Sequence, residues 1–290
     1  MNPDAHASKP GRTPVSNVSD TARWVAVYRA RESARPDALF EDSLAERLAG
    51  QHGRDIAARF PRMMRSGWWL VARTKVIDDI ILEAIDDGCD RVLNLAAGLD
   101  TRPYRLELPP GFTWVEGDLP ALLAEKEQLL ADQRPRCSLT RHAVDLADPA
   151  ARDQFLTEAL AGATKALVLT EGLLMYLETR DVAALSEAFT RPEIAWWMLD
   201  LAGPGLKKFM NDKTDGLLQN APFKFAPANG LGYFEELGWH PVEVESVFDA
   251  AYRFHRLPWL YRLAAHLPQP DAHRPPEKRP WSAVVRLTRG

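Results

Sequence analysis

The chain has 290 residues, of which 46% are hydrophobic and 26% charged, an ordinary composition for a globular protein with a large core. The formal net charge of -4 disfavours a general nucleic-acid binder, because such proteins carry an excess of Lys and Arg. The two cysteines, Cys89 and Cys137, lack the spacing of a zinc site or a disulfide framework. We therefore expect no metal site and a reducing, cytoplasmic location.

The amino-terminal residues 1–19 are polar and contain Pro3, Pro10 and Pro14. They lack the apolar run of a signal peptide, so we expect a disordered tail there. No apolar stretch of the chain is long enough to span a bilayer. Residues 20–290 are expected to form a single domain.

Two helical regions open this domain. In residues 20–50, Trp24, Val27 and Arg31 recur at helical spacing before a break at Pro36. A second helix is predicted over residues 66–86, where the apolar residues have a period close to 3.6. We expect residues 20–86 to form a helical cap.

Short apolar segments alternate with helical segments after residue 88. Strands are predicted at residues 91–97, 113–118, 139–145, 165–171 and 194–201, and the last of these is the most apolar. Helix starts between them are predicted from Pro120, from Asp148 with Pro149, and from Thr179 as a capping residue. This alternation predicts an α/β fold with a doubly wound, mostly parallel sheet.

The carboxyl-terminal part departs from this rhythm. Residues 203–233 mix Gly, Pro and Asn with large apolar side chains, which indicates an inserted lid or a wall of a substrate site. Two further strands are predicted at residues 240–247 and 281–288. Between them we expect a helix over residues 252–266 and a Pro-rich loop over residues 268–280.

Ligands of an open parallel sheet bind beyond the carboxyl ends of its strands. Three of the predicted strands end at an acidic residue: Asp118, Asp145 and Glu171. Gly98 follows the first strand and can let a ligand approach the backbone closely. Asp118 lies 20 residues beyond Gly98, where an acid commonly binds a ribose diol. The carboxylates suit a ligand rich in donors, such as a nucleoside with a cationic methionine moiety, better than a pyrophosphate.

Structural roles are open for the same residues. Gly98 can simply serve a turn, and Asp118 or Asp145 can cap the segment that follows it. Arg73 shares an apolar helix face with Trp69 and Val76 and therefore needs an anionic partner. That partner is either an internal carboxylate such as Asp100 or the carboxylate of a ligand.

Three segments together resemble the leucine carboxyl methyltransferase family. They are NLAAGLDTRPYRL at residues 94–106, WVEGDLP at 114–120 and LVLTEGLLMYL at 167–177. The chain is most similar to the bacterial branch, which includes O-methyltransferases of polyketide pathways. The resemblance covers residues 20–200 and implies a Rossmann-like class I methyltransferase fold of seven strands, with S-adenosyl-L-methionine as cofactor. One departure is that the loop at residues 96–98 holds a single glycine.

The resemblance also implies roles for particular residues. Arg73 would hold the methionine carboxylate, while Ala96 and Gly98 would line the methionine backbone. Asp118, with Leu119 beside it, would bind the ribose hydroxyls. Asp145 and the Leu146 amide would bind the adenine, and Glu171 would lie near the methionine amino group.

The implied activity is O-methylation of a small apolar molecule, at a carboxylate in preference to a hydroxyl. The motifs contain no histidine that could act as a base, and an ionised carboxylate needs none. Glu171 and Tyr176 are the candidate catalytic residues beside the acceptor, although Tyr176 can equally be a packing residue.

The acceptor is expected to be enclosed by aromatic residues of the first helices and of the insertion, with an arginine to orient it. The candidates in the first helices are Trp24, Tyr28 and Phe40, with Arg23, Arg29 or Arg31. A peptide carboxyl terminus is a further possible acceptor. No nucleic-acid or membrane partner is expected.

Two other functions are compatible with such a sheet. A nicotinamide-dependent oxidoreductase would need a GxGxxG turn or a YxxxK pair, and the sequence contains neither. A nonenzymatic module that binds S-adenosyl-L-methionine and regulates a partner would keep the cofactor contacts without turnover.

Overall fold

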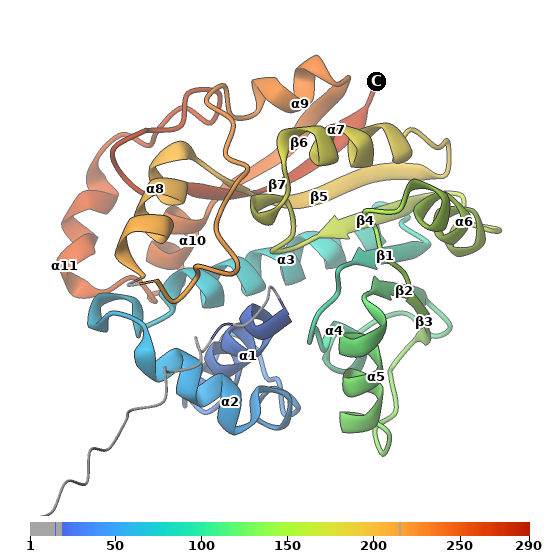
Figure 1. Ribbon diagram of the computed structural model, residues 1–290, viewed down its shortest axis with the longest axis horizontal. Coiled ribbons are helices and arrows are strands. Elements are labelled where there is room, and N and C mark those ends of the chain that lie inside the picture. The colour runs from blue at the N-terminus through green and yellow to red at the C-terminus, as the bar shows by residue number, and fades with distance from the viewer. Residues whose placement is uncertain (1–14, 16–18, 215) are drawn as a thin grey trace, which may run out of the picture.

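The computed structural model describes residue 15, residues 19–214 and residues 216–290. A seven-stranded sheet with the order β3-β2-β1-β4-β5-β7-β6 forms its centre (Figure 1). β7 pairs antiparallel with both β5 and β6, and all the other neighbouring strands pair parallel. The strands are β1 (Arg91–Leu95), β2 (Thr113–Asp118), β3 (Ser138–Ala143), β4 (Ala166–Thr170), β5 (Ile194–Ala202), β6 (Trp239–Ser246) and β7 (Ser282–Arg289).

Helices cover both faces of the sheet. They are α1 (Ser19–Ser33), α2 (Ala45–Arg59), α3 (Trp68–Asp86), α4 (Arg102–Arg105), α5 (Pro120–Leu129), α6 (Pro149–Ala159), α7 (Thr179–Ala188), α8 (Pro204–Lys213), α9 (Gly232–Glu236), α10 (Val247–Arg253) and α11 (Trp259–Arg262). Short 3-10 helices are η1 (Arg62–Met64), η2 (Leu174–Tyr176) and η3 (Leu263–His266). The predicted doubly wound, mostly parallel sheet is confirmed. The predicted tail lies outside the described residues, apart from residues 15 and 19.

Two local predictions are wrong. Thr179 is the first residue of α7, not its cap, and the preceding Glu178 makes no capping hydrogen bond through its side chain. The helix expected over residues 252–266 is divided, because His255 has a left-handed backbone with φ 57° and Pro258 precedes α11. The cap predicted at Asp148 is present: its carboxylate accepts hydrogen bonds from the amides of Ala150 and Ala151.

The long helix α3 lies directly on the sheet. Its buried residues Val76 and Ile77 belong to the same apolar cluster as Trp114 of β2 and Leu167 of β4. Helix α10 packs beside α3 on this face (Figure 1). Within the expected helical cap of residues 20–86, α3 is thus a layer of the central fold, whereas α1 and α2 pack mainly against each other.

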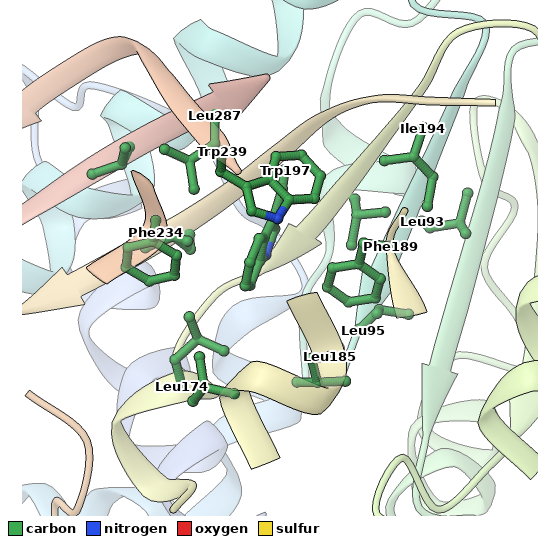
Figure 2. Close-up of a cluster of buried hydrophobic side chains, with 14 of the residues drawn as sticks. Leu93, Leu95, Leu174, Leu185, Phe189, Ile194, Trp197, Phe234, Trp239 and Leu287 are labelled. Atoms are coloured by element: carbon green, nitrogen blue, oxygen red, sulfur yellow. The ribbon is translucent and has the colours of Figure 1, made fainter. Parts of the chain in front are cut away.

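The opposite face carries an aromatic cluster around Trp197 of β5. Figure 2 shows its indole ring beside Phe189, Phe234 and Trp239, and their rings lie 5.1 to 5.4 Å from it in edge-on arrangements. The indole N–H of Trp197 donates to the hydroxyl of Thr170 at 2.8 Å, so burial leaves no polar atom of this side chain unpaired. Packing on both faces fixes the positions of the strand ends.

Residues 203–233 begin with α8 and continue as an irregular segment to α9. Met210, Leu217, Leu218 and Phe223 are buried in one cluster with Trp24 and residues of α2. The segment therefore forms a packed wall beside the first helices, and its mobility as a lid stays a prediction. No helix in the described part of the chain is long and apolar enough to cross a membrane.

Candidate active site

A cavity of about 750 Å³ lies at the carboxyl ends of the parallel strands. Segments that follow β1, β2, β3 and β4, the end of β5 and the start of β7 all contribute to its wall. Every residue predicted from the sequence to bind the cofactor or to act in catalysis lines it: Arg73, Ala96, Gly98, Asp118, Leu119, Asp145, Leu146, Glu171 and Tyr176.

The loop after β1 has an unusual backbone. Ala96 and Gly98 both have positive φ values, of 53° and 51°. For alanine this conformation costs about 1 kcal/mol, and such strain commonly occurs where a loop is shaped for a ligand. A side chain at position 98 would bring its Cβ within 3.2 Å of the Cβ of Ala22. Glycine is therefore favoured at position 98 both by the positive φ and by the close approach of Ala22.

Asp118 joins the ends of β1 and β2. One oxygen of its carboxylate accepts the backbone N–H of Gly98 at 2.6 Å, and the other accepts that of Leu119 at 2.7 Å. Burial raises the pKa of Asp118, although the two amide donors oppose this shift. It makes no capping bond to α5, which begins after Leu119 without one. Each oxygen retains a lone pair for a further donor.

Asp145 and Leu146 form the edge of the cavity after β3. The exposed carboxylate of Asp145 accepts the N–H of Ala147 at 2.9 Å. This is the local hydrogen bond expected if Asp145 caps the segment that follows it. Leu146 is half-buried, and its N–H makes no hydrogen bond within the described residues. A free carboxylate oxygen and a free amide thus stand next to each other at the cavity wall.

Arg73 lies between two carboxylates. Its guanidinium contacts Glu171 at 3.0 Å and Asp200 at 2.7 Å, so the internal ion pair exists, but with partners other than the suggested Asp100. The Nε of Arg73 is buried without a hydrogen-bond partner among the described residues. Arg73 therefore keeps a donor that is not used by the protein.

Arg102 occupies the centre of a larger buried ion-pair network. It contacts Asp78 at 2.7 Å, Asp100 at 2.8 Å and Glu171 at 2.7 Å. The side-chain amide of Asn94 on β1 also donates to Asp100, at 2.8 Å. The cations Arg102 and Arg73 hold the pKa of Glu171 below its usual value despite burial, so this residue stays ionised.

Tyr176 belongs to η2 and packs edge-on against Phe223, with ring centroids 5.4 Å apart. Burial raises the pKa of its hydroxyl to about 12, so it is protonated at neutral pH. Tyr176 thus packs against the 203–233 segment and also lines the cavity, so its position is compatible with a packing role and with a place beside the acceptor.

The expected acceptor residues of the first helices divide into two groups. Trp24 and Arg29 line the cavity, whereas Tyr28 and Phe40 do not. The Arg29 guanidinium is already engaged, since it pairs with the buried Asp42 at 2.8 Å. Arg23 pairs with Glu125, and Arg31 lies over the ring of Tyr28. Arg23 and Arg29 are thus paired with carboxylates, and Arg31, which forms no salt bridge within the described residues, does not line the cavity.

Three site residues escaped the sequence reading: Asp200, Arg102 and Asn94. Asp200 stands in the strongly apolar strand β5, and an acid in such a strand is itself a signal. Arg102 and Asn94 belong to the 94–106 motif and both contact Asp100 within it, but Arg102 also pairs with Asp78 and Glu171, which are 24 and 69 residues away. Within the described residues, no cluster of His, Cys, Asp and Glu could hold a metal ion.

The set of donors and acceptors around the cavity fits S-adenosyl-L-methionine. Carboxylates match ribose hydroxyls and amino groups, while the free Nε of Arg73 matches a carboxylate. A model of the leucine carboxyl methyltransferase family matches residues 22–190. The chain belongs to this family. It is an S-adenosyl-L-methionine-dependent methyltransferase, and this result decides against a nicotinamide-dependent oxidoreductase.

Relatives support the family membership across most of the chain. A protein of Parafrankia sp. (strain EAN1pec), named as an S-adenosyl-L-methionine-dependent methyltransferase, is 34% identical over 77% of this chain and 71% of its own length. A protein of Frankia alni with the same kind of name is 32% identical over 85% of this chain and 90% of its own length.

Solved structures agree with the fold. A DUF574 family protein from Streptomyces avermitilis covers 93% of this chain and 97% of its own, with a TM-score of 0.57 and 14% identity. A Thermobifida fusca protein described as a methyltransferase covers 92% of this chain and 94% of its own, with a TM-score of 0.53 and 17% identity. At these identities the likeness concerns the fold alone.

Proposed function

We propose that this methyltransferase acts on a carboxylate oxygen of a small, largely apolar molecule. The observation that carries the proposal is that the cavity lining offers none of the side chains that most commonly act as a general base at neutral pH. Among the described residues, no histidine, lysine or cysteine lines it. A carboxylate acceptor is ionised at neutral pH and needs no base, whereas a hydroxyl usually does.

The cofactor would be held by the residues at the strand ends. When bound, S-adenosyl-L-methionine supplies a methyl group on a sulfonium. Arg73 would donate to its carboxylate, Asp118 would accept from the ribose hydroxyls, and Glu171 would accept from its amino group. Asp145 and the free N–H of Leu146 would bind the adenine edge.

The acceptor would occupy the apolar part of the same cavity. This part is distant in sequence from the strand-end loops and comes from η1, α3, α8, α10 and the start of β7. Its side chains include Met63, Trp68, Leu206, Phe209, Phe248 and Trp281. Such a wall favours an apolar molecule, excludes water and aligns the reacting oxygen, and these effects supply most of the catalysis in a displacement of this kind.

Glu171 and Tyr176 would act without exchanging protons. The cations Arg102 and Arg73 lower the pKa of Glu171, so its negative charge would favour a cationic ligand and it would be a weak base. Tyr176 keeps its proton because its pKa is about 12, and it would therefore donate a hydrogen bond.

A hydroxyl acceptor is the second candidate, and Asp200 is the observation in its favour. This acid is buried, lines the cavity and has a pKa raised by burial. It accepts the N–H of Gly172 at 2.7 Å and pairs with Arg73. If cofactor binding drew Arg73 away, Asp200 would become a competent base.

The product bond distinguishes the two candidates. Purified enzyme with methyl-labelled cofactor is offered matched carboxylic acids and phenols, and the product is treated with mild base. We expect a methyl ester that releases labelled methanol, and we expect Asp200→Asn to retain turnover. A base-stable ether whose formation is lost in Asp200→Asn would overturn the carboxylate proposal in favour of the hydroxyl one.

A further inference from the structure

The cavity opens to the surface through a rim that combines apolar and basic side chains. We define the rim as residues 59–65, which include η1, and residues 259–280, which include α11 and η3. Met63 in the first segment and Tyr261 in the second are exposed, and both line the cavity. Trp68 and Phe248, whose rings lie 6.0 Å apart, link the neighbouring helices α3 and α10 behind it.

Large apolar side chains project from the second rim segment. Trp259 is 75% exposed and Leu263 is 83% exposed, and Leu260 and Leu267 beside them are also exposed. In Figure 1, α11 lies at the outer margin of the molecule. Contiguous exposed apolar residues of this size mark an interaction surface.

The charge of the rim is opposite to that of the chain. Its two segments hold seven Lys or Arg residues and only two Asp or Glu residues, whereas the chain has 36 basic and 40 acidic residues. None of these seven cations forms a salt bridge within the described residues: Arg59, Arg62, Arg65, Arg262, Arg274, Lys278 and Arg279. Charges that the fold does not pair are available to an anionic partner.

We propose that this rim docks the enzyme on an anionic lipid bilayer, with the mouth of the cavity facing the membrane. Trp and Leu side chains flanked by Lys and Arg are the composition of helices that lie in a membrane interface. A second copy of the chain is disfavoured as the occupant, because a twofold contact would set two basic rims against each other. The expectation of no membrane partner rested on the lack of a membrane-spanning segment. Peripheral docking needs no such segment, so it is compatible with the absence of a spanning helix from the described residues.

Docking would let an apolar acceptor pass from the bilayer into the cavity. Only this part of the inference rests on the proposed function. Docking itself can be measured without turnover, so its failure and the failure of carboxylate methylation are distinguishable. Trp259 and Leu263 do not line the cavity, and changes there leave the catalytic residues in place.

The test is co-sedimentation with phosphatidylcholine vesicles that contain or lack phosphatidylglycerol. We expect the full-length protein to bind only the anionic vesicles and to dissociate at high salt. Leu263→Asp should lower the partition coefficient at least about tenfold, and Arg262→Gln about fivefold. Val242→Asp is the matched control, since Val242 is 50% exposed on β6 outside the rim and should not affect binding.

Three results would overturn the proposal. The first is equal sedimentation with and without the anionic lipid, and the second is equal loss of binding in Val242→Asp and Leu263→Asp. The third comes from sedimentation velocity without lipid: a wild-type dimer that Leu263→Asp converts to a monomer would assign the rim to a second copy. We expect wild type and variant to sediment alike.

Discussion

The two ends of the cavity use charge in opposite ways. At the strand ends, Arg102 is 2% exposed and contacts three carboxylates. At the rim, Arg279 is exposed and forms no ion pair with any residue that the structure describes. A buried ion pair holds its two side chains in place, because separating them would leave an unpaired charge in the interior at a large cost in free energy. Exposed charged side chains are solvated by water and can adopt many conformations. The strand ends thus suit one ligand held in a fixed geometry, and the rim suits an extended surface.

The largest expected effect concerns the buried network. Arg102→Ala leaves Asp78, Asp100 and Glu171 without their shared cation, so the free energy of unfolding should fall by about 3–5 kcal/mol. Urea denaturation followed by fluorescence measures it. Arg274→Ala, at an exposed cation of the rim, is the control and should change stability by less than about 0.5 kcal/mol. If both variants lost similar free energy of unfolding, the buried network at the strand ends would be no more important for stability than the exposed charges of the rim.

The second prediction concerns Arg73 and the amino-acid part of the cofactor. Arg73→Ala should weaken S-adenosylhomocysteine by about 10- to 100-fold, because a charge-assisted contact is lost. It should weaken 5′-methylthioadenosine, which lacks the carboxylate, much less. Calorimetric titration of both ligands gives the ratio. Equal losses would mean that Arg73 serves only its ion pairs with Glu171 and Asp200.

The third prediction concerns Asp118. Asp118→Ala should lower the affinity for S-adenosylhomocysteine by about 1–3 kcal/mol, because the ribose hydroxyls and the Gly98 amide lose their acceptor. Asp118→Asn retains one oxygen and should lose less. Calorimetry again measures the affinity, while thermal unfolding checks that the fold persists. Normal binding by Asp118→Ala would contradict the assignment.

A smaller effect is expected on acidification. The pKa of Glu171 is lowered in the fold, so its stabilising contribution is present above its unfolded pKa of about 4.3 and is lost as pH falls through the folded value. The pKa values of Asp118 and Asp200 are raised, so their ionisation destabilises the fold and their protonation on acidification partly offsets this loss. Urea denaturation from about pH 6 to about pH 3 should show a shallower decline for Glu171→Gln than for wild type. Parallel curves would show that the network does not depend on this charge.

Much of the fold could be predicted because its strands are short apolar runs between helical segments. The bounds expected for β2 are those observed, and the other strands differ by one or two residues at an end. The break in the helix expected over residues 252–266 was missed although Pro258 signals it, whereas the left-handed backbone of His255 leaves no clear signal in the sequence. A Gly at that position would have given one.

Strand ends revealed the acidic part of the site, whereas Arg73 was noticed as a cation on an apolar helix face. Asp118, Asp145 and Glu171 were found because an acid after an apolar run is visible in the sequence. Asp200 precedes the end of its strand by two residues and was read as part of an apolar run. The partners of Arg73 and Arg102 come from residues up to 127 positions away, and pairing at that distance is decided by tertiary structure.

Hydrogen exchange with and without S-adenosylhomocysteine tests the contrast between the two ends most directly. We expect added protection in the loops that follow β1, β2, β3 and β4, at residues 96–101, 118–123, 144–148 and 171–176. We expect little change in the rim at residues 259–280. Protection that appears mainly in the rim, with none at the strand ends, would contradict the assignment of the strand ends to the cofactor and of the rim to another partner.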